Sequence, residues 1–305
     1  MSNLGSTYSN PMMGSNTSGG LMSGFRNNRL VSGGSEFLNS NSLVAKVSFL
    51  ILIIILFIFF LRLGTQVLNY VLGPSTSPVL LKGMHDGKKQ KIIEQDPKVN
   101  GAIPVLRSNN ERYGTEFTYS VWLFIDDVRY KPGQKKHIFH KGSEDFSDDK
   151  GSSINDVKTF GMAFPNNGPG LYLTDDQTEP NKLVVVMNTF DDIIEEIEIP
   201  NIPLNKWINV VIRVSNRNMD VYINGTIAVR HKFESVPKQN YGKVYCCMNG
   251  GFSGDISQLK YWNRALSGVE IAANNNSGPN MQQDESMHIF PPYLSLRWFF
   301  NTQNN

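Results

Sequence analysis

The sequence predicts an all-β antiparallel jelly-roll sandwich that is preceded by a disordered tail and one transmembrane helix. Three observations predict this arrangement. Between residues 102 and 271, apolar and polar residues alternate in short runs separated by Gly, Asn, Asp and Pro, as in half-buried strands. Residues 47–61 form an apolar run with Ser48 as its one polar member. Residues 1–42 are rich in Ser, Asn and Gly and hold too few apolar residues to offset the entropy of ordering.

Charge and cysteine content narrow the function classes. The net charge is +2 over 305 residues, so no basic field indicates a nucleic-acid partner and no acidic tail indicates a cation buffer. The two cysteines, Cys246 and Cys247, are adjacent, and a disulfide between them would require a strained ring. We therefore expect two free thiols, which fits folding in a reducing compartment.

The transmembrane helix is predicted over residues 43–63, a length that crosses a bilayer core. Lys46 and Arg62 flank it near its ends, where long basic side chains reach the headgroups. A cleaved signal peptide fits poorly, because the run begins far from the N-terminus and lacks a small-x-small cleavage site. A buried core helix is the other alternative. An excess of about one basic residue before the span favours a cytoplasmic N-terminus.

Residues 64–100 are predicted to form a linker between the helix and the sandwich. The stretch "GPSTSP" (73–78) interrupts any continuing helix. The charged stretch that follows is either solvated or held near anionic headgroups by its lysines.

The sandwich is predicted over residues 101–272 and a C-terminal extension over 273–305. In residues 116–127, alternate residues from Phe117 to Ile125 share one face, while Trp122 and Phe124 indicate that part of the other face is covered as well. Residues 206–233 predict three strands, the last two joined by a type I′ turn at Asn224–Gly225. Residues 255–264 predict the last strand, followed by a short helix over "SGVEI".

Two passages resemble a known family. The stretch "KWINVVIRVSNRNMDVYINGTIAV" (206–229) resembles laminin-G-like and pentraxin-like domains, and "GGFSGDISQLKYWNRALSGVEI" (250–271) resembles their closing strand. With "FTYSVWLFID" and "HIFHKG" as opening strands, the resemblance implies a concanavalin A-like lectin/glucanase jelly roll. The wider order of polar head, span, jelly roll and aromatic tail resembles virion membrane proteins of large nucleocytoplasmic DNA viruses. In such domains Gly225 and Gly254 would serve backbone turns.

No complete catalytic motif is found, and we expect a protein that is not an enzyme. Glucanases of the resembled fold carry carboxylates as E-x-D-x-x-E on one strand. Glu196 and Glu198 share a face in "DDIIEEIEIP", but no Asp stands between them, so a solvent-facing strand edge is the preferred interpretation. The five histidines are too scattered for a metal site, and there is no G-x-S-x-G nucleophile motif.

Calcium is the one cofactor for which candidate ligands exist. Many relatives of the resembled fold hold a calcium ion on the sandwich rim, and calcium requires clustered loop oxygens. Asp175 and Asp176, in "LTDDQTEPN", are the candidate ligands. Simply polar, soluble loops are the alternative.

Aromatic residues supply the remaining candidates. Four strand aromatics suit stacking on a sugar, although core packing explains each of them: Trp207, Tyr222, Tyr261 and Trp262. The aromatic tail, residues 288–305, either packs back on the sandwich as an edge strand or docks on a partner or membrane.

The sequence therefore predicts a single-pass membrane protein that displays a jelly roll for binding or scaffolding. Its expected partners are a lipid bilayer, through the helix, and a protein neighbour or a glycan, through the jelly roll, but not nucleic acid. A virion membrane or minor capsid component, in a virion or a virus-associated internal membrane, is the preferred role. A calcium-dependent carbohydrate-binding adhesin is the alternative, and a membrane-tethered glycosidase is a third.

Overall fold

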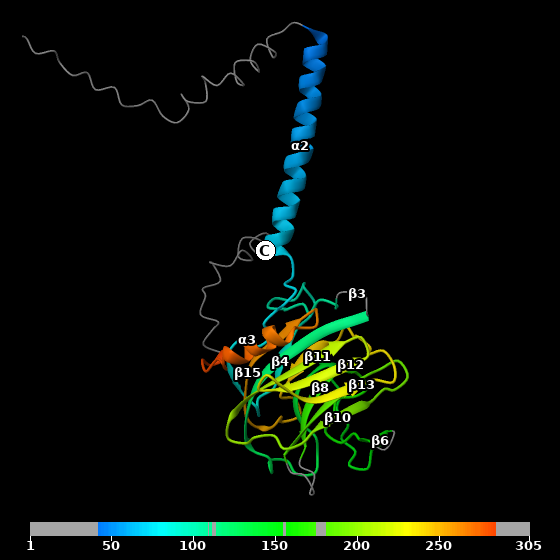
Figure 1. Ribbon diagram of the computed structural model, residues 1–305, viewed down its shortest axis with the longest axis vertical. Coiled ribbons are helices and arrows are strands. Elements are labelled where there is room, and N and C mark those ends of the chain that lie inside the picture. The colour runs from blue at the N-terminus through cyan, green and yellow to red at the C-terminus, as the bar shows by residue number, and fades with distance from the viewer. Residues whose placement is uncertain (1–41, 109, 112–113, 155–156, 175–180, 285–305) are drawn as a thin grey trace, which may run out of the picture. The chain divides into compact units, whose positions relative to one another are not determined.

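The computed structural model describes residues 42–108, 110–111, 114–154, 157–174 and 181–284 (Figure 1). The chain forms two compact units, residues 1–73 and 74–305. The predicted disordered tail, the aromatic tail, and both candidate calcium ligands, Asp175 and Asp176, lie outside the described residues.

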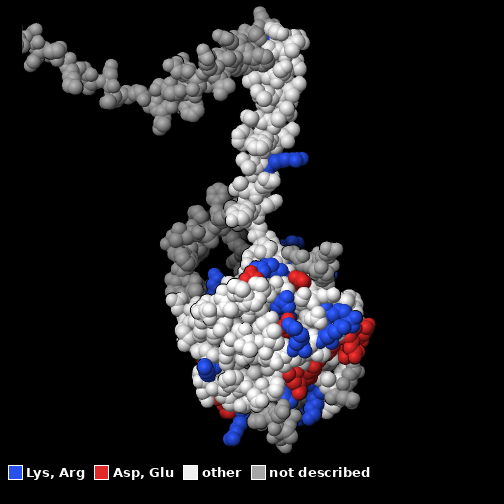
Figure 2. Space-filling view, in the orientation of Figure 1, with Lys and Arg blue, Asp and Glu red and all other residues white. Residues whose placement is uncertain are grey.

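The first unit contains one long helix, α2 (Leu43–Leu72). Its stretch Leu43–Tyr70 contains an 18-residue window with a mean hydropathy of 3.0, which makes the helix long and apolar enough to cross a membrane. Lys46 lies in its first turn and Arg62 lies in its second half. The surface of α2 is almost entirely uncharged (Figure 2). The helix continues nine residues past the predicted end at residue 63, because the polar residues after Arg62 remain helical.

The second unit is a sandwich of two antiparallel sheets, which confirms the predicted fold class. The first sheet runs, in spatial order, β1 (Met84–Asp86), β15 (Ser253–Trp262), β4 (Gly114–Asp127), β11 (Trp207–Ser215), β12 (Asn218–Ile223) and β13 (Thr226–Lys232), with β3 (Asn110–Glu111) paired to β4. The second runs β10 (Glu195–Ile199), β9 (Lys182–Met187), β8 (Asn167–Thr174), β5 (Lys136–Gly142), β14 (Lys243–Cys246) and β2 (Lys91–Ile93). A small hairpin of β6 (Ser153–Ile154) and β7 (Val157–Lys158) stands apart from both.

The core lies between the two sheets. The inward face of β4 carries the alternate residues that sequence analysis placed on one face, and all five are buried in the main cluster: Phe117, Tyr119, Val121, Leu123 and Ile125. At the turn between β12 and β13, Asn224 and Gly225 both have positive φ, as the type I′ prediction requires. Gly254 instead lies inside β15 at a bulge, where a side chain would meet the carbonyl oxygen of Phe124.

Both outer faces of the sandwich are partly covered. α3 (Gly268–Asn276) begins with a capping box between Ser267 and Glu270 and buries Ile271 against the first sheet. The connection from β5 to β8 covers the second sheet, where Tyr172, Val184 and Val186 form a separate apolar cluster. The predicted cover on one side of β4 is thus confirmed in α3, which lies beside β4 and β15 (Figure 1).

The predicted linker over residues 64–100 requires correction. Besides the end of α2, this segment contains β1 and β2, which pair with β15 and β14. Leu80, Leu81 and Ile93 are buried in the main core. These strands are only three residues long and alternate poorly, so their partners far along the chain decide their conformation. The sandwich also extends past residue 272, because Asn280 donates to Lys82 O (3.1 Å) and Asp284 forms an ion pair with Lys91.

Candidate functional site

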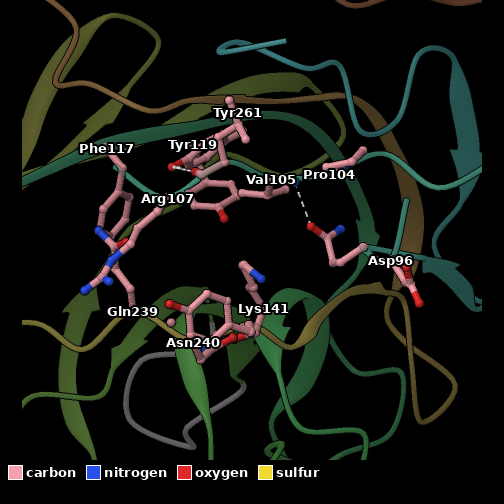
Figure 3. Close-up of a pocket in the computed structure, with 14 residues that line it drawn as sticks. Asp96, Pro104, Val105, Arg107, Phe117, Tyr119, Lys141, Gln239, Asn240 and Tyr261 are labelled. Atoms are coloured by element: carbon pink, nitrogen blue, oxygen red, sulfur yellow. Dashed lines mark hydrogen bonds between the residues drawn. The ribbon is translucent and has the colours of Figure 1, made fainter. Parts of the chain in front are cut away.

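A cavity of about 320 Å³ lies between the two sheets at one end of the sandwich (Figure 3). The first sheet contributes Phe117, Tyr119 and Tyr261, and the second contributes Lys141. The segments around residues 95–107 and 239–241, together with Gly168 of β8, complete the lining. This volume is at the lower end of the range of roughly 300–1,000 Å³ found for ligand pockets.

The aromatic wall of the cavity is held rigidly by core contacts. Alternation along β4 directs Tyr119 inward, where its ring centroid lies 5.6 Å from that of Phe139 and 4.9 Å from that of Tyr261. The Tyr261 hydroxyl donates to the carbonyl of Leu106 (2.7 Å) and so joins β15 to the loop above the cavity. The wall is therefore preformed, as is usual for small-molecule sites.

Side-chain amides shape the polar part of the rim. Gln95 Oε1 accepts from the backbone N–H of Val105 (2.8 Å), and Gln239 Oε1 accepts from that of Ser108 (3.3 Å). Asn240 Nδ2 donates to the carbonyl of Lys141 (2.9 Å). The first two bonds satisfy backbone groups outside the sheets, and the third ties the loop at Asn240 to β5.

Lys141 and Tyr119 face each other across the cavity (Figure 3). The Lys141 ammonium donates to Gly242 O and has no carboxylate partner within the described residues. Burial lowers the pKa of Lys141 to about 8. Burial, followed by the nearby Tyr261, raises the pKa of Tyr119 well above its usual value, so its hydroxyl stays neutral. No hydrogen bond within the described part of the chain occupies that hydroxyl.

The charged residues at the rim are mainly basic. Arg107 is exposed and lacks an ion-pair partner among the described residues, and Asp96 is the one carboxylate in the lining. A hydrogen-bonding cation and a free hydroxyl beside an aromatic wall can bind a polar or anionic ligand. The lining contains no pair of carboxylates, no histidine and no cysteine.

The matching family is described as the concanavalin A-like lectin/glucanases superfamily, and its profile, of laminin G type, matches residues 100–272, more than half of the chain. The chain belongs to this superfamily. The fold that the sequence resemblance implied is thereby confirmed. A comparison with curated protein sequences found no match.

Solved structures with a similar fold include binding domains of botulinum neurotoxins. The serotype C1 binding domain is 17% identical with a TM-score of 0.39, over 55% of this chain and 37% of that one. The receptor-binding domain of botulinum neurotoxin D is 10% identical with a TM-score of 0.43, over 66% and 52%. The neurotoxin DC binding domain, solved in complex with rat synaptotagmin II, is 14% identical with a TM-score of 0.41, over 66% and 51%. The chain thus spans about half or less of these domains, and likeness at this level says nothing of what it binds.

The carboxylates that came nearest to a glucanase motif are each paired with a basic side chain. Glu195, Glu196 and Glu198 on β10 lie 2.7, 2.5 and 2.9 Å from His231, Lys135 and Lys182 respectively. Ile197 and Ile199, which alternate with these glutamates, are buried in the main core. The glutamates therefore have partners that stabilise the edge of the second sheet.

Among the described residues, no group of three or more His, Cys, Asp or Glu side chains is arranged to hold a metal ion. Of the four strand aromatics considered for sugar stacking, only Tyr261 lines the cavity, whereas Tyr222 and Trp262 pack beneath α3. Cys246 and Cys247 are free and buried, which confirms the expected thiols. Burial raises the pKa of both, so neither is a ready nucleophile.

Sequence analysis missed Lys141, Arg107 and the amides Gln239 and Asn240. Lys141 ends the strand "KHIFHKG", and a lysine directly before a strand-terminal glycine is an ordinary edge feature. The other three lie in loops, where polar residues are expected. In β5 only Ile138 and Phe139 are apolar, so its composition gave no signal that Lys141 is buried.

Proposed function

We propose that this protein is a membrane-anchored, non-catalytic binding protein whose jelly roll binds a glycan in the cavity between Tyr119 and Lys141. The observation that carries the proposal is the buried Lys141 ammonium, which has no carboxylate partner in the described structure and faces a preformed aromatic wall. Burying a cation without a counter-charge is costly, and a ligand that accepts hydrogen bonds offsets that cost. Aromatic faces and amides are suited to the apolar and hydroxyl faces of a sugar.

The anchor in this proposal is α2. Its length and hydropathy suit a single bilayer span. We further infer an N-terminal head on the cytoplasmic side and a place in a virion or virus-associated internal membrane, as a virion membrane or minor capsid component. The support is the sequence order of polar head, apolar helix and sandwich. Protease protection of the head in sealed vesicles would check its side of the membrane. Detection of the chain in purified particles would check the virion location.

The cavity gives a direct prediction for binding. Lys141→Met in the full-length protein should lower affinity for a bound glycan about tenfold or more, because a hydrogen bond to a charged group contributes roughly 1.5–3 kcal/mol. Tyr119→Phe should lower affinity by a smaller factor while preserving stability, since the hydroxyl has no hydrogen bond to lose within the described residues. The measurement is calorimetric titration of the detergent-solubilised protein with the strongest glycan from an array. Unchanged affinity in both variants would place the ligand elsewhere.

The same site predicts a pH dependence. The Lys141 pKa of about 8 leaves the side chain charged at neutral pH and neutral at higher pH. Affinity should therefore be full below pH 7 and decline as the pH rises through about 8. Titrations between pH 6 and 9 check this, with Lys141→Met as the control that should show no such decline.

A calcium-dependent adhesin is the second candidate, supported by the loop acids Asp175 and Asp176. If it holds, chelation by EDTA should abolish glycan binding, and Asp175→Asn with Asp176→Asn should do the same. If the cavity alone binds, EDTA should leave the affinity unchanged.

The third candidate function is a glycosidase. In that case sugar release should disappear in Glu196→Gln or Glu198→Gln. The ion pairs of these two glutamates do not favour such an activity.

A further inference from the structure

A second hollow of about 290 Å³ adjoins the cavity. The two share Arg107, Gln239 and Asn240 in their linings. The second hollow continues along the rim past Phe190 and Lys238. Because three residues line both, the hollows are direct neighbours, and we call the two compartments together the rim groove.

Each compartment of the rim groove has an exposed aromatic side chain. Tyr241 lines the first and is 85% exposed, and Phe190 lines the second and is 65% exposed. These are the two large aromatic side chains that stand exposed on the described part of the sandwich. Exposed rings that line two neighbouring hollows, while the other described aromatics of the sandwich are at least partly buried, indicate a surface for a partner.

The cations of the groove also lack carboxylate partners. Arg107, Lys141 and Lys238 form no ion pair within the described residues, and the Lys238 ammonium lies 5.3 Å from the Phe190 ring centroid. On β10, by contrast, Glu196 and Glu198 are paired with lysines and Glu195 is paired with His231. Asp96 is the single carboxylate in either lining. The groove therefore has an excess of positive charge in a protein whose net charge is only +2.

We propose that the rim groove binds an acidic glycan chain across at least two adjacent sugar units. One unit lies by Tyr241 and the Tyr119 wall, and the next lies against Phe190. Carboxylate or sulfate groups on the chain are neutralised by Arg107, Lys141 and Lys238, and Gln239 and Asn240 contact hydroxyls where the compartments meet. This inference rests on the proposed function and adds both the charge and the minimum length of the ligand.

Single-stranded nucleic acid shares the combination of anionic groups and stacking faces. The glycan is favoured because the cations number only three and the amides at the junction suit hydroxyl groups, whereas non-specific nucleic-acid binding depends on many phosphate contacts. A polyuridine oligonucleotide is therefore included among the probes.

The experiment uses the full-length chain in detergent micelles. Its probes are di- and tetrasaccharides of hyaluronan, chondroitin sulfate and heparan sulfate, sialylated lactose paired with lactose, and neutral chitotetraose. We expect acidic probes to bind more tightly than neutral ones, tetrasaccharides to bind about tenfold or more tightly than disaccharides, and added salt to weaken binding. Tight binding of polyuridine, or equal affinity for acidic and neutral probes, would overturn the inference.

Variants separate the two compartments. Phe190→Ala and Lys238→Gln should lower tetrasaccharide affinity about fivefold and leave disaccharide affinity unchanged, whereas Tyr241→Ala should lower both. Lys206→Gln is the matched control, because Lys206 is an exposed lysine away from the groove. The neighbouring Asn205 N–H donates to the carbonyl of Ile125, near the end of β4 opposite to the groove residue Phe117. If glycan affinity depends on Lys141 but changes neither with Phe190→Ala nor with the length of the glycan, the proposed function stands and this inference fails. If no glycan binds, both fail.

Discussion

Lowering the pH from 7 towards 4 should destabilise the sandwich, because two buried histidines must then accept protons. His137 and His140 lie beneath the connection from β5 to β8, packed against Phe146, Tyr172 and Tyr245. The Met248 N–H donates to His137 Nδ1 (2.9 Å), so that nitrogen must be the acceptor. His137 Nε2–H then donates to His140 Nδ1 (2.7 Å), and His140 Nε2–H donates to Ser143 O (2.7 Å). Neither ring has a free nitrogen for a further proton.

The sign of the effect follows from the folded pKa values. Burial lowers the pKa of His140 to about 4, and burial together with His140 lowers that of His137 well below its usual value. At pH values between these folded-state pKa values and the unfolded-state pKa of about 6.5, the unfolded chain binds more protons than the folded one. The contribution of the neutral histidine pair to stability is therefore fully present above pH 6.5 and declines as the pH falls. Each proton contributes about 1.4 kcal/mol per pH unit. For His140 alone the total loss is on the order of 3 kcal/mol by pH 4.

Urea unfolding of the full-length protein at several pH values between 5 and 7.5 measures this loss. Free carboxylates have reference pKa values of about 4, below this window. A variant with both His137→Gln and His140→Gln should show a much smaller pH slope, whatever its absolute stability. An equal slope in the two proteins would contradict the assignment to this pair.

Phe139→Ala should lower the free energy of unfolding by about 3–5 kcal/mol, the range for removing a buried phenylalanine. Phe139 is fully buried on β5 and its ring contacts Tyr119, so the cavity that remains lies directly behind the aromatic wall. Glycan affinity should fall together with stability, because Tyr119 loses the ring that holds it in place.

Urea unfolding again provides the measurement, and calorimetric titration below the unfolding transition provides the second readout. Ile227→Ala is the matched control, because Ile227 lies on the exposed strand β13 and is 45% exposed. It should cost less than 1 kcal/mol and leave affinity unchanged, as surface substitutions mostly do. Similar losses in both variants would mean that Phe139 does not support the core as described.

Local patterns predicted much of this fold. Alternation along residues 117–125 specified which side chains enter the core, because a strand's side chains point to opposite faces in turn. Asn224–Gly225 specified the hairpin, because both residues tolerate positive φ. The apolar composition of residues 43–63 specified a helix, although its end at Leu72 was missed, since hydropathy does not report where helical geometry stops.

The histidine pair illustrates what local patterns could not predict. His137 and His140 are three residues apart, so in a regular strand they would point to opposite faces. Register shifts in the pairing of β5 with β8, between His137 and Phe139 and again between His140 and Gly142, accompany the placement of both rings on one face. The sequence offered two unremarkable histidines, and the extra residue that β5 inserts between His137 and Phe139 in its pairing with β8 makes them partners.

By itself, the sequence determined the sandwich, its apolar interior and the helix that precedes it, because these depend on periodicity and composition within one segment. Tertiary structure alone decided the short strands β1 and β2, the histidine pair and the rim groove. Lys141, Tyr119, Arg107 and Phe190 come from four separate segments of the chain and meet only when the two sheets close on each other. Such long-range contacts leave no periodic signal in the sequence, because the environment of each of these residues depends on residues that are distant along the chain.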